Sequence, residues 1–104
     1  MTTAVNLKAL RRFDSQRFVS QLIHDSEKAR VALFCLEPGQ EVPPHSASSE
    51  VVFMVVEGKG QVVVGNDQVA VEAGSLVVGP PLVPHGLKAE ERLVVVAVIA
   101  PRPG

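Results

Sequence analysis

Short valine-rich runs, separated by glycine and proline, restrict most strongly what this sequence can fold into. The eight glycines and eight prolines lie mostly between the runs, where glycine forms tight turns and proline ends strands. In 68–72 valines alternate at the period of a strand, whereas 30–37 and 93–100 are apolar on both faces and predict covered strands. The runs that we predict to be strands are 17–24, 30–37, 51–56, 61–65, 68–72, 73–81 and 93–100.

Turn signals between the runs indicate how the strands are connected. Glycines in 57–60 predict a hairpin between the flanking runs, 65–67 predicts a second tight turn, and a further hairpin leads into 73–81. About eight short strands, with turns roughly every 8–12 residues, are typical of an all-β sandwich or barrel. A single short helix is expected at 6–10, with Asn6 as its N-cap.

The length of 104 residues predicts one domain, which buries roughly 65% of its unfolded surface. We divide it into an N-terminal segment at 1–16, a β-barrel at 17–100 and a tail at 101–104. The N-terminal segment is expected to be a short helix or extended. No stretch has the composition of a linker, and the sequence has no convincing internal repeat.

Charge and cysteine content exclude several classes of partner. Ten basic and eleven acidic residues leave a formal charge of −1 without a block of like charge, so neither nucleic acid nor an anionic membrane is favoured. The lone cysteine, Cys35, excludes an internal disulfide and suits a reducing compartment. No stretch is typical of a signal peptide or a membrane span. We therefore expect a cytoplasmic protein whose partner is a small molecule or a protein.

Two stretches of the sequence resemble the signatures of the cupins. The first, PGQEVPPHSASSEVVFMVVEGKG at 38–60, is similar to G(X)5HXH(X)3,4E(X)6G, with Gly39, His45 and Gly58 in register. The second, GSLVVGPPLVPHGLKA at 74–89, is similar to G(X)5PXG(X)2H(X)3N. The resemblance covers about half of the chain and implies an all-β cupin double-stranded β-helix, which is a jelly-roll barrel.

The second stretch matches its signature at three positions and departs from it at two. Gly74, Pro80 and His85 are in register, and a glycine after the histidine is typical of the family. Leu82 stands where the signature has a glycine, and Ala89 where it has an asparagine. Both departures concern the turn and leave the histidine in place.

In cupins two histidines and a glutamate of the first signature join the histidine of the second around a divalent metal. The resemblance implies His45 and His85 as ligands here, but Ala47 and Val51 stand at the two remaining positions. Glu50 comes one residue too early, and because side chains alternate along a strand it is expected to point out of the barrel. A one-residue bulge in 46–49 would turn Glu50 inward, but the unchanged spacing from His45 to the following glycine gives no support for one.

Two histidines bind a divalent transition metal, such as zinc, nickel, iron, manganese or copper, more weakly than three or four protein ligands do. Taken singly, each histidine is typical of a loop or a turn. Occurring at both signature positions, His45 and His85 are expected to face each other in one barrel mouth. A metal site and a metal-free pocket both stay open, and we favour the metal-free pocket.

The pocket is expected along the inner face of the first-signature strand. Its inner face is small and apolar with one polar end, and the absence of Trp and Tyr from the sequence disfavours a sugar isomerase or epimerase. An aromatic residue on such a face is often plain core. The residues that we expect to line the pocket are Ala47, Ser49, Val51, Phe53 and Val55.

Three functions follow from the resemblance and stay open, because cupins carry many unrelated activities. The favoured one is a small single-domain cupin that binds a small molecule, with an incomplete metal site and no assignable reaction. The second is a metal-dependent oxygenase or isomerase of a small organic substrate that uses the two histidines. The third is a non-catalytic structural or interaction domain. No spacing nominates a nucleophile with its base, so the sequence does not decide whether the protein is an enzyme.

The apolar content of 30–37 and 93–100 also bears on assembly. Both runs are apolar at more positions than one barrel interior needs, so an outer sheet face is expected to be covered. The resemblance to cupins of this size implies a dimer in which two barrels pack sheet to sheet. We therefore predict a homodimer, with exchange of the N-terminal segments as a variant of that arrangement.

Overall fold

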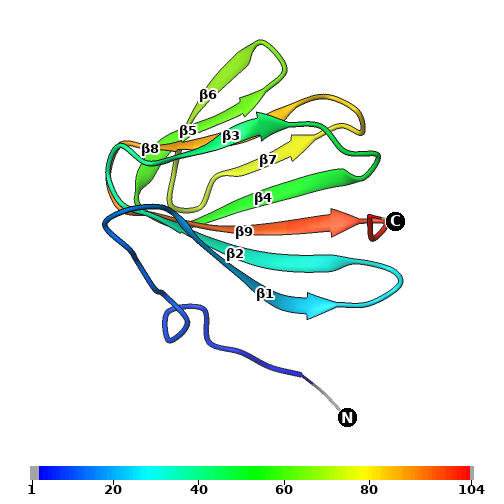
Figure 1. The fold of residues 1–104 in the computed structure, drawn as a ribbon, viewed down its shortest axis with the longest axis horizontal. Coiled ribbons are helices and arrows are strands. Elements are labelled where there is room, and N and C mark those ends of the chain that lie inside the picture. Colours follow the sequence, from blue (N-terminus) through cyan, green and yellow to red (C-terminus); the bar gives the residue numbers. More distant parts are fainter. Residues whose placement is uncertain (1–2, 104) are drawn as a thin grey trace.

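The computed structural model describes residues 3–103, which contain nine β-strands and no helix (Figure 1). The strands are β1 (Val19–Asp25), β2 (Arg30–Leu36), β3 (Glu41–His45), β4 (Glu50–Glu57), β5 (Lys59–Val64), β6 (Asp67–Glu72), β7 (Leu76–Gly79), β8 (His85–Ala89) and β9 (Leu93–Ala100). Residues 1, 2 and 104, at the outer ends of the predicted N-terminal segment and tail, lie outside the described residues.

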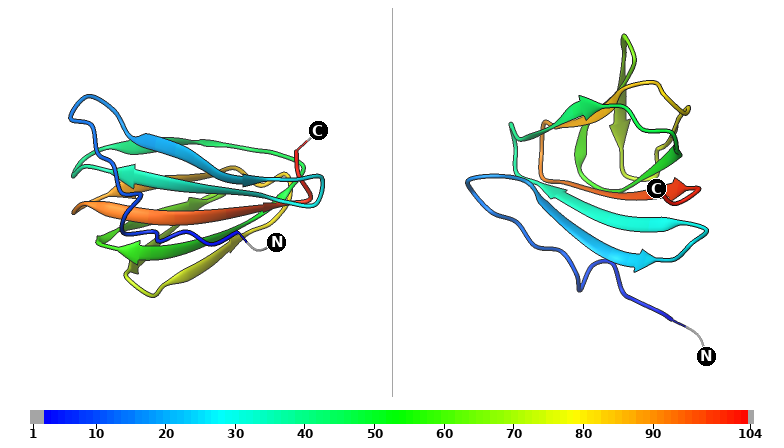
Figure 2. Two further views of the ribbon diagram at one scale, coloured as in Figure 1. Left: turned by 90° about the horizontal axis from the view of Figure 1, so that it is seen from below. Right: turned by 45° about the vertical axis from the view of Figure 1, so that its right-hand side comes forward.

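The strands form two antiparallel sheets that face each other across the core. One sheet has five strands in the order β1-β2-β9-β4-β7, and the other has four in the order β3-β8-β5-β6. Figure 2 shows the two sheets curling around a common interior. The predicted all-β jelly-roll fold is therefore confirmed. Because the described residues form no helix, none of them forms one that is long and apolar enough to cross a membrane.

The predicted connections between strands are only partly correct. The tight turn at 65–67 joins β5 and β6 in a hairpin, with Val64 opposite Asp67. The hairpin predicted across 57–60 is wrong, because β4 pairs with β7 and β9 whereas β5 pairs with β6 and β8. The further hairpin into β7 is wrong for the same reason, since β6 and β7 belong to different sheets.

Gly58 shows why the chain changes sheets between β4 and β5. Its φ of 91° belongs to the left-handed region, and a Cβ there would lie 1.7 Å from the backbone oxygen of Arg92. The backbone can approach the start of β9 this closely only without a side chain. The glycine that resembles a hairpin signal therefore carries the chain across the base of the barrel.

Two of the nine strands, β3 and β8, are missing from the sequence-based prediction. β3 contains Pro43 and Pro44, which argue against a strand in the middle of a sheet. It is tolerated because β3 lies at the edge of the four-stranded sheet and pairs only with β8. β8 is only five residues long and follows the prolines of the second signature, so its sequence has no clear strand pattern.

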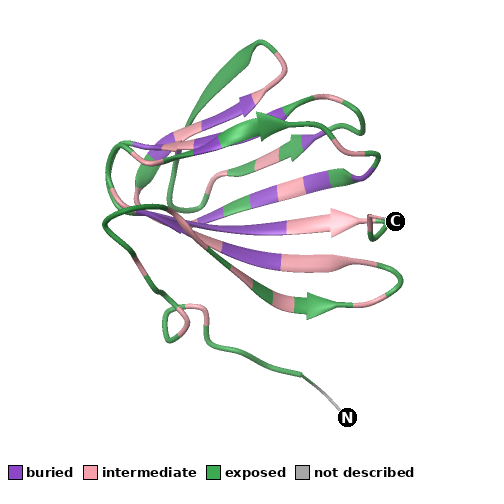
Figure 3. Cartoon of the chain, in the orientation of Figure 1, coloured by how far each residue is buried: buried purple, intermediate pink, exposed green. Residues whose placement is uncertain are grey.

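The main core lies between the two sheets and follows the alternation of side chains. On β4, Val51, Phe53 and Val55 are buried whereas Met54 is exposed. Figure 3 shows buried stretches alternating with less buried ones along β4. The buried residues of this core are Leu36, Val42, Val51, Phe53, Val55, Val62, Val71, Leu87, Ala89, Leu93, Val95 and Ala97.

A second, smaller cluster covers the outer face of β2 and β9. Leu7, Leu10 and Phe13 of the N-terminal segment pack against it, which explains why these two strands are apolar on both faces. The four buried residues of this cluster are Leu33, Cys35, Val94 and Val96. The chain's own N-terminal segment thus covers part of the face for which the sequence predicted a second copy.

The N-terminal segment is extended and contains a turn in place of the predicted helix. The N–H groups of Ala9 and Leu10 donate to carbonyl oxygens three residues back, which forms a turn and not a helix. Asn6 still acts as the expected cap, because its Oδ1 accepts hydrogen bonds from the N–H groups of Lys8 and Ala9. A segment this short does not form a stable helix by its own propensity. Apolar contacts with the sheet hold the turn in place.

Candidate functional site

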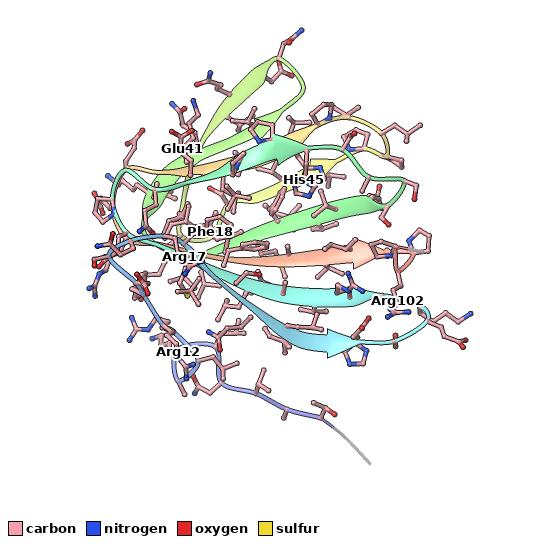
Figure 4. The ribbon with its side chains drawn as sticks, viewed as in Figure 1. Arg12, Arg17, Phe18, Glu41, His45 and Arg102 are labelled. Atoms are coloured by element: carbon pink, nitrogen blue, oxygen red, sulfur yellow. The ribbon has the colours of Figure 1, made fainter. Side chains whose placement is uncertain are left out.

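His45 and His85 meet at one end of the barrel. They are partners across β3 and β8, and their ring centroids lie 4.8 Å apart with the planes inclined at 56°. His45 projects from the end of β3 toward the space between the sheets (Figure 4). His45 is exposed, whereas only 6% of His85 is exposed. One histidine thus stands at the entrance and the other lies below it.

A bulge in β3 turns His45 toward the interior. Val42 pairs with Leu87 and His45 pairs with His85, so three steps along β3 match two steps along β8. Simple alternation would place Val42 and His45 on opposite faces, but the extra residue of the bulge restores both to the same face. The two prolines between them occupy the irregular part of the ladder. The bulge that matters for the site therefore precedes His45 and does not lie in 46–49.

Gly86 allows the two histidine-bearing strands to approach each other. A Cβ at this position would lie 2.5 Å from the carbonyl oxygen of Val42 and 2.9 Å from the nitrogen of Pro44. No real side chain fits at these distances. The glycine directly after His85 is thus a steric requirement of the site.

A small cavity lies beside the histidine pair. Its volume is about 40 Å³, which is room for roughly three water molecules or a short apolar group. Apart from the two histidines, the side chains around it are apolar. The residues that line it are Phe34, Val42, His45, Val51, Phe53, His85, Gly86, Leu87, Ala97 and Ile99.

Burial keeps His85 in its neutral form at pH 7. Removal from water lowers the pKa of His85 below its ordinary value of 6.5; the hydrogen bond to Val83 opposes this, and the charge of His45 adds to it. Phe53 packs against His85 in an edge-to-face arrangement with the ring centroids 5.6 Å apart. The neutral ring therefore sits in a largely apolar setting.

The neighbouring backbone carbonyls favour one tautomer of each histidine ring. His85 Nδ1 lies 3.4 Å from the carbonyl oxygen of Val83, and His45 Nδ1 lies 3.5 Å from that of Pro43. Both contacts are long and favour the tautomer with hydrogen on Nδ1. Each Nε2 then carries a lone pair, which accepts a hydrogen bond or binds a metal ion.

The residues around the histidine pair do not form the ligand set of a cupin metal site. The position of the family's glutamate is held by Val51, of which 2% is exposed and which pairs with Gly79. A Cβ at Gly79 would lie 2.7 Å from Cγ1 of Val51 and 3.8 Å from Nδ1 of His85, so valine methyls pack close to the histidine. Glu50 is exposed on the outer face of β4. Within residues 3–103, no three His, Cys, Asp or Glu side chains converge.

Two of the five residues predicted for the pocket line the cavity. Val51 and Phe53 do so, whereas Val55 lies deeper in the core. Ala47 is half-buried in the loop before β4, where its carbonyl oxygen accepts a hydrogen bond from Leu82. Ser49 is buried, but its hydroxyl donates to the carbonyl oxygen of Pro101 at 2.6 Å and so fixes the C-terminal tail.

Most of the remaining cavity wall comes from strands other than β4. Phe34 belongs to β2, and Ala97 and Ile99 belong to β9. The sequence could have indicated these residues only through the alternation of side chains within 30–37 and 93–100. Because the outer faces of both strands are also apolar, that alternation is not visible in the sequence. Val42, Gly86 and Leu87 lie on the two strands that the sequence-based prediction lacked.

Comparison with known proteins extends the likeness to the whole chain. A family model described as a cupin domain matches residues 32–99. An RmlC-like cupin protein from Desulfovibrio desulfuricans is 36% identical, with a TM-score of 0.90, over 97% of this chain and 98% of that one. The protein TT1209 from Thermus thermophilus is 29% identical, with a TM-score of 0.91, over 96% of this chain and 98% of that one.

A more distant likeness concerns the fold alone. Salicylate 1,2-dioxygenase from Pseudoaminobacter salicylatoxidans is 22% identical, with a TM-score of 0.77, over 83% of this chain and 25% of that one. No curated protein is significantly similar to this chain in sequence. The family model and the Desulfovibrio protein together establish that this chain belongs to the cupins.

Proposed function

We propose that this cupin binds a small, largely apolar molecule in the cavity at the barrel mouth, with His45 and His85 as its polar contacts. The observation that carries the proposal is the convergence of two histidines, forty positions apart in the sequence, at a ring separation of 4.8 Å beside an otherwise apolar cavity. An apolar pocket with few polar groups is the usual form of a small-molecule site. The proposal includes no chemical reaction.

The shape of the site indicates what kind of molecule fits. A cavity of about 40 Å³ admits a short aliphatic group and leaves the rest of the ligand at the entrance. The Nε2 lone pairs favour a ligand with a hydrogen-bond donor next to its apolar part. Because His85 is buried and neutral at pH 7, its hydrogen bond would be little weakened by competing water.

Filling the cavity tests the proposal. Ala97 is 1% exposed and faces the cavity, so the two methyl groups added by Ala97→Val would occupy its space. The matched control is Ala70→Val, because Ala70 is exposed on β6 away from the histidines. The probe is butyramide, which has a short alkyl chain and N–H donors.

We expect saturable butyramide shifts of the His85 and Phe53 resonances in NMR titrations of the wild-type protein. Ala97→Val should weaken binding by about tenfold or more, because the alkyl chain loses the space that it fills. Ala70→Val should bind as the wild type does. Absence of saturable shifts in the wild type, or equal affinity in both variants, would overturn the proposal.

A metal-dependent enzyme is the alternative function. The observation that favours it is the pair of neighbouring imidazoles, whose Nε2 atoms suit a divalent transition metal. Against it, Val51 stands where the family has a carboxylate ligand. Elemental analysis of protein purified without a nickel column decides between them. Stoichiometric metal that disappears in both His45→Ala and His85→Ala would support the alternative, and a metal-free wild type would remove it.

A further inference from the structure

Two arginines beside the histidine end of the barrel add a charged subsite to the proposed cavity. We infer that the natural ligand is a small organic carboxylate, whose short apolar part enters the cavity and whose carboxylate is bound by Arg30 and Arg102. This inference rests on the proposed function and specifies the chemical class of its ligand.

Arg30 begins on the cavity side of the five-stranded sheet. It pairs with Ile99 of β9, and Ile99 pairs in turn with Val51 of β4. Side chains directly opposite each other in a sheet project to the same face. Ile99 and Val51 both line the cavity, so the Arg30 side chain starts from the same face, one strand farther out.

The C-terminal tail brings a second guanidinium group to Arg30. Ser49 fixes the tail by donating its hydroxyl hydrogen to the carbonyl oxygen of Pro101. Arg102 then donates from Nε and Nη2 to the two carboxylate oxygens of Asp25, at 2.5 and 3.1 Å. Arg30 donates to the same Asp25 at 3.5 Å. One carboxylate therefore holds two arginines together.

The cluster of Asp25, Arg30 and Arg102 carries a net charge of +1. The hydrogen bond from Arg102 is the main cause that lowers the pKa of Asp25, so this carboxyl stays ionised near neutral pH. Arg30 and Arg102 retain side-chain exposures of 33% and 43%, which leaves both within reach of a ligand. A guanidinium has five N–H donors, and the bonds to Asp25 use one from Arg30 and two from Arg102.

This two-to-one arrangement differs from the other ion pairs among residues 3–103. Arg11 pairs with Glu57, Arg92 with Glu37 and Lys88 with Glu41, each cation with its own carboxylate. Asp25 alone in this described part is shared by two cations. This cluster therefore has one more positive than negative charge, which suits an anionic ligand.

The cluster and the cavity lie at the same end of the barrel. Figure 1 shows β1 and β9 ending and β2 beginning on the right-hand side, with β3 pointing toward the same side. Arg102 and His45 are both found toward that end in Figure 4. The entrance beside the exposed His45 is apolar inside and positively charged on its β1–β2 side. A carboxylate with a short alkyl chain matches both parts.

A comparison of butyrate with butyramide tests the inference, because the two molecules differ mainly in charge. NMR titrations at pH 7.5 and low salt should show that the wild type binds butyrate about tenfold more tightly than butyramide. The double variant Arg30→Gln, Arg102→Gln should lose this preference and bind butyramide as before. Arg92→Gln, which removes a bidentate arginine from the opposite end of the barrel, should keep the preference.

The outcomes separate this inference from the proposed function. Saturable butyramide binding without a preference for butyrate, or a preference that survives in the double variant, would overturn the inference and leave the proposed function intact. If neither probe binds, or both bind equally well to Ala97→Val, the proposed function fails and the inference fails with it. Thermal unfolding of each variant confirms that it is folded.

Discussion

Val51 and Gly79 face each other across β4 and β7 so closely that a Cβ on residue 79 would lie 2.7 Å from Cγ1 of Val51. Contacts under 3 Å are not tolerated between carbon atoms, so any side chain at position 79 must displace the valine. The floor of the histidine site is therefore a matched pair of one branched residue and one glycine.

Gly79→Ala is expected to lower the free energy of unfolding by about 1–3 kcal/mol, because it overpacks the contact with Val51. Chemical denaturation measures the change. A double-mutant cycle with Val51→Ala provides the control, since removal of the valine methyls should make the same substitution at position 79 nearly neutral. Additive effects in the cycle would contradict the direct contact.

Val51→Glu restores the type of side chain that the family places at this position. Without metal, a buried carboxylate should destabilise the protein by about 3 kcal/mol. With His45 and His85 beside it, the variant should regain stability when ZnCl₂ is added, and the measurement is the midpoint of thermal unfolding with and without the metal. The control is Val52→Glu, which faces the other side of β4 and should show no zinc response. An equal response in both variants would show that position 51 does not face the histidines.

The lowered pKa of His85 predicts how stability depends on pH. Because the folded protein holds this histidine neutral, the unfolded chain binds the proton more readily. Stability should therefore fall as the pH decreases through the ordinary value of 6.5 and level off below the folded-state pKa, while above 6.5 this residue contributes no slope. Asp25 acts in a separate window, because its own pKa is lowered from 3.8 and the stability that it adds is lost only in more acidic solution.

Denaturation curves between pH 5 and 8 measure this effect. His85→Phe should flatten the slope in that range. A slope that persists in His85→Phe would assign the proton uptake to another group.

The outer face of β4 and β7 bears on the predicted homodimer. Met54 pairs with Leu76 and Val52 pairs with Val78, so their side chains form one apolar patch, with Leu76 58% exposed and Val78 47% exposed. The N-terminal segment packs on β2 and β9 and does not account for this patch. A second copy packed sheet to sheet would cover it, as expected for an isologous dimer.

Sedimentation equilibrium at micromolar concentration measures the assembly. We expect a dimer for the wild type and a monomer for Leu76→Lys, which places a charge in the middle of the patch. Val69→Lys on β6 is the control and should stay dimeric. A monomeric wild type would reject the homodimer.

The sequence predicts the local features of this fold better than the choice of sheet. Alternation on β4 correctly separates buried Phe53 from exposed Met54, because that pattern depends only on neighbouring positions. The change of sheet at Gly58 depends on the backbone of Arg92, which comes 34 positions later and leaves no local trace. In the sequence, a glycine between two strands looks the same whether the strands form a hairpin or belong to different sheets.

The candidate site is predictable where a motif fixes a residue and unpredictable where tertiary structure supplies it. The two signatures identify His45 and His85 as a pair, and the structure brings their rings together. Phe34 and Ile99 reach the cavity from strands that carry no motif. Asp25 and Arg102 are 77 positions apart, and their contact requires the tail to turn back over the end of the barrel.

The consecutive prolines of β3 have a consequence beyond the position of His45. Pro43 and Pro44 lack N–H groups, and they lie in a strand whose outer edge has no partner among the described residues. An unpaired edge normally invites a passing strand from another molecule, but an edge that lacks two donors and is interrupted by a bulge offers no regular ladder to extend. The same pair of residues therefore protects the protein from edge-to-edge aggregation and keeps the way to the histidines from being sealed by a foreign strand.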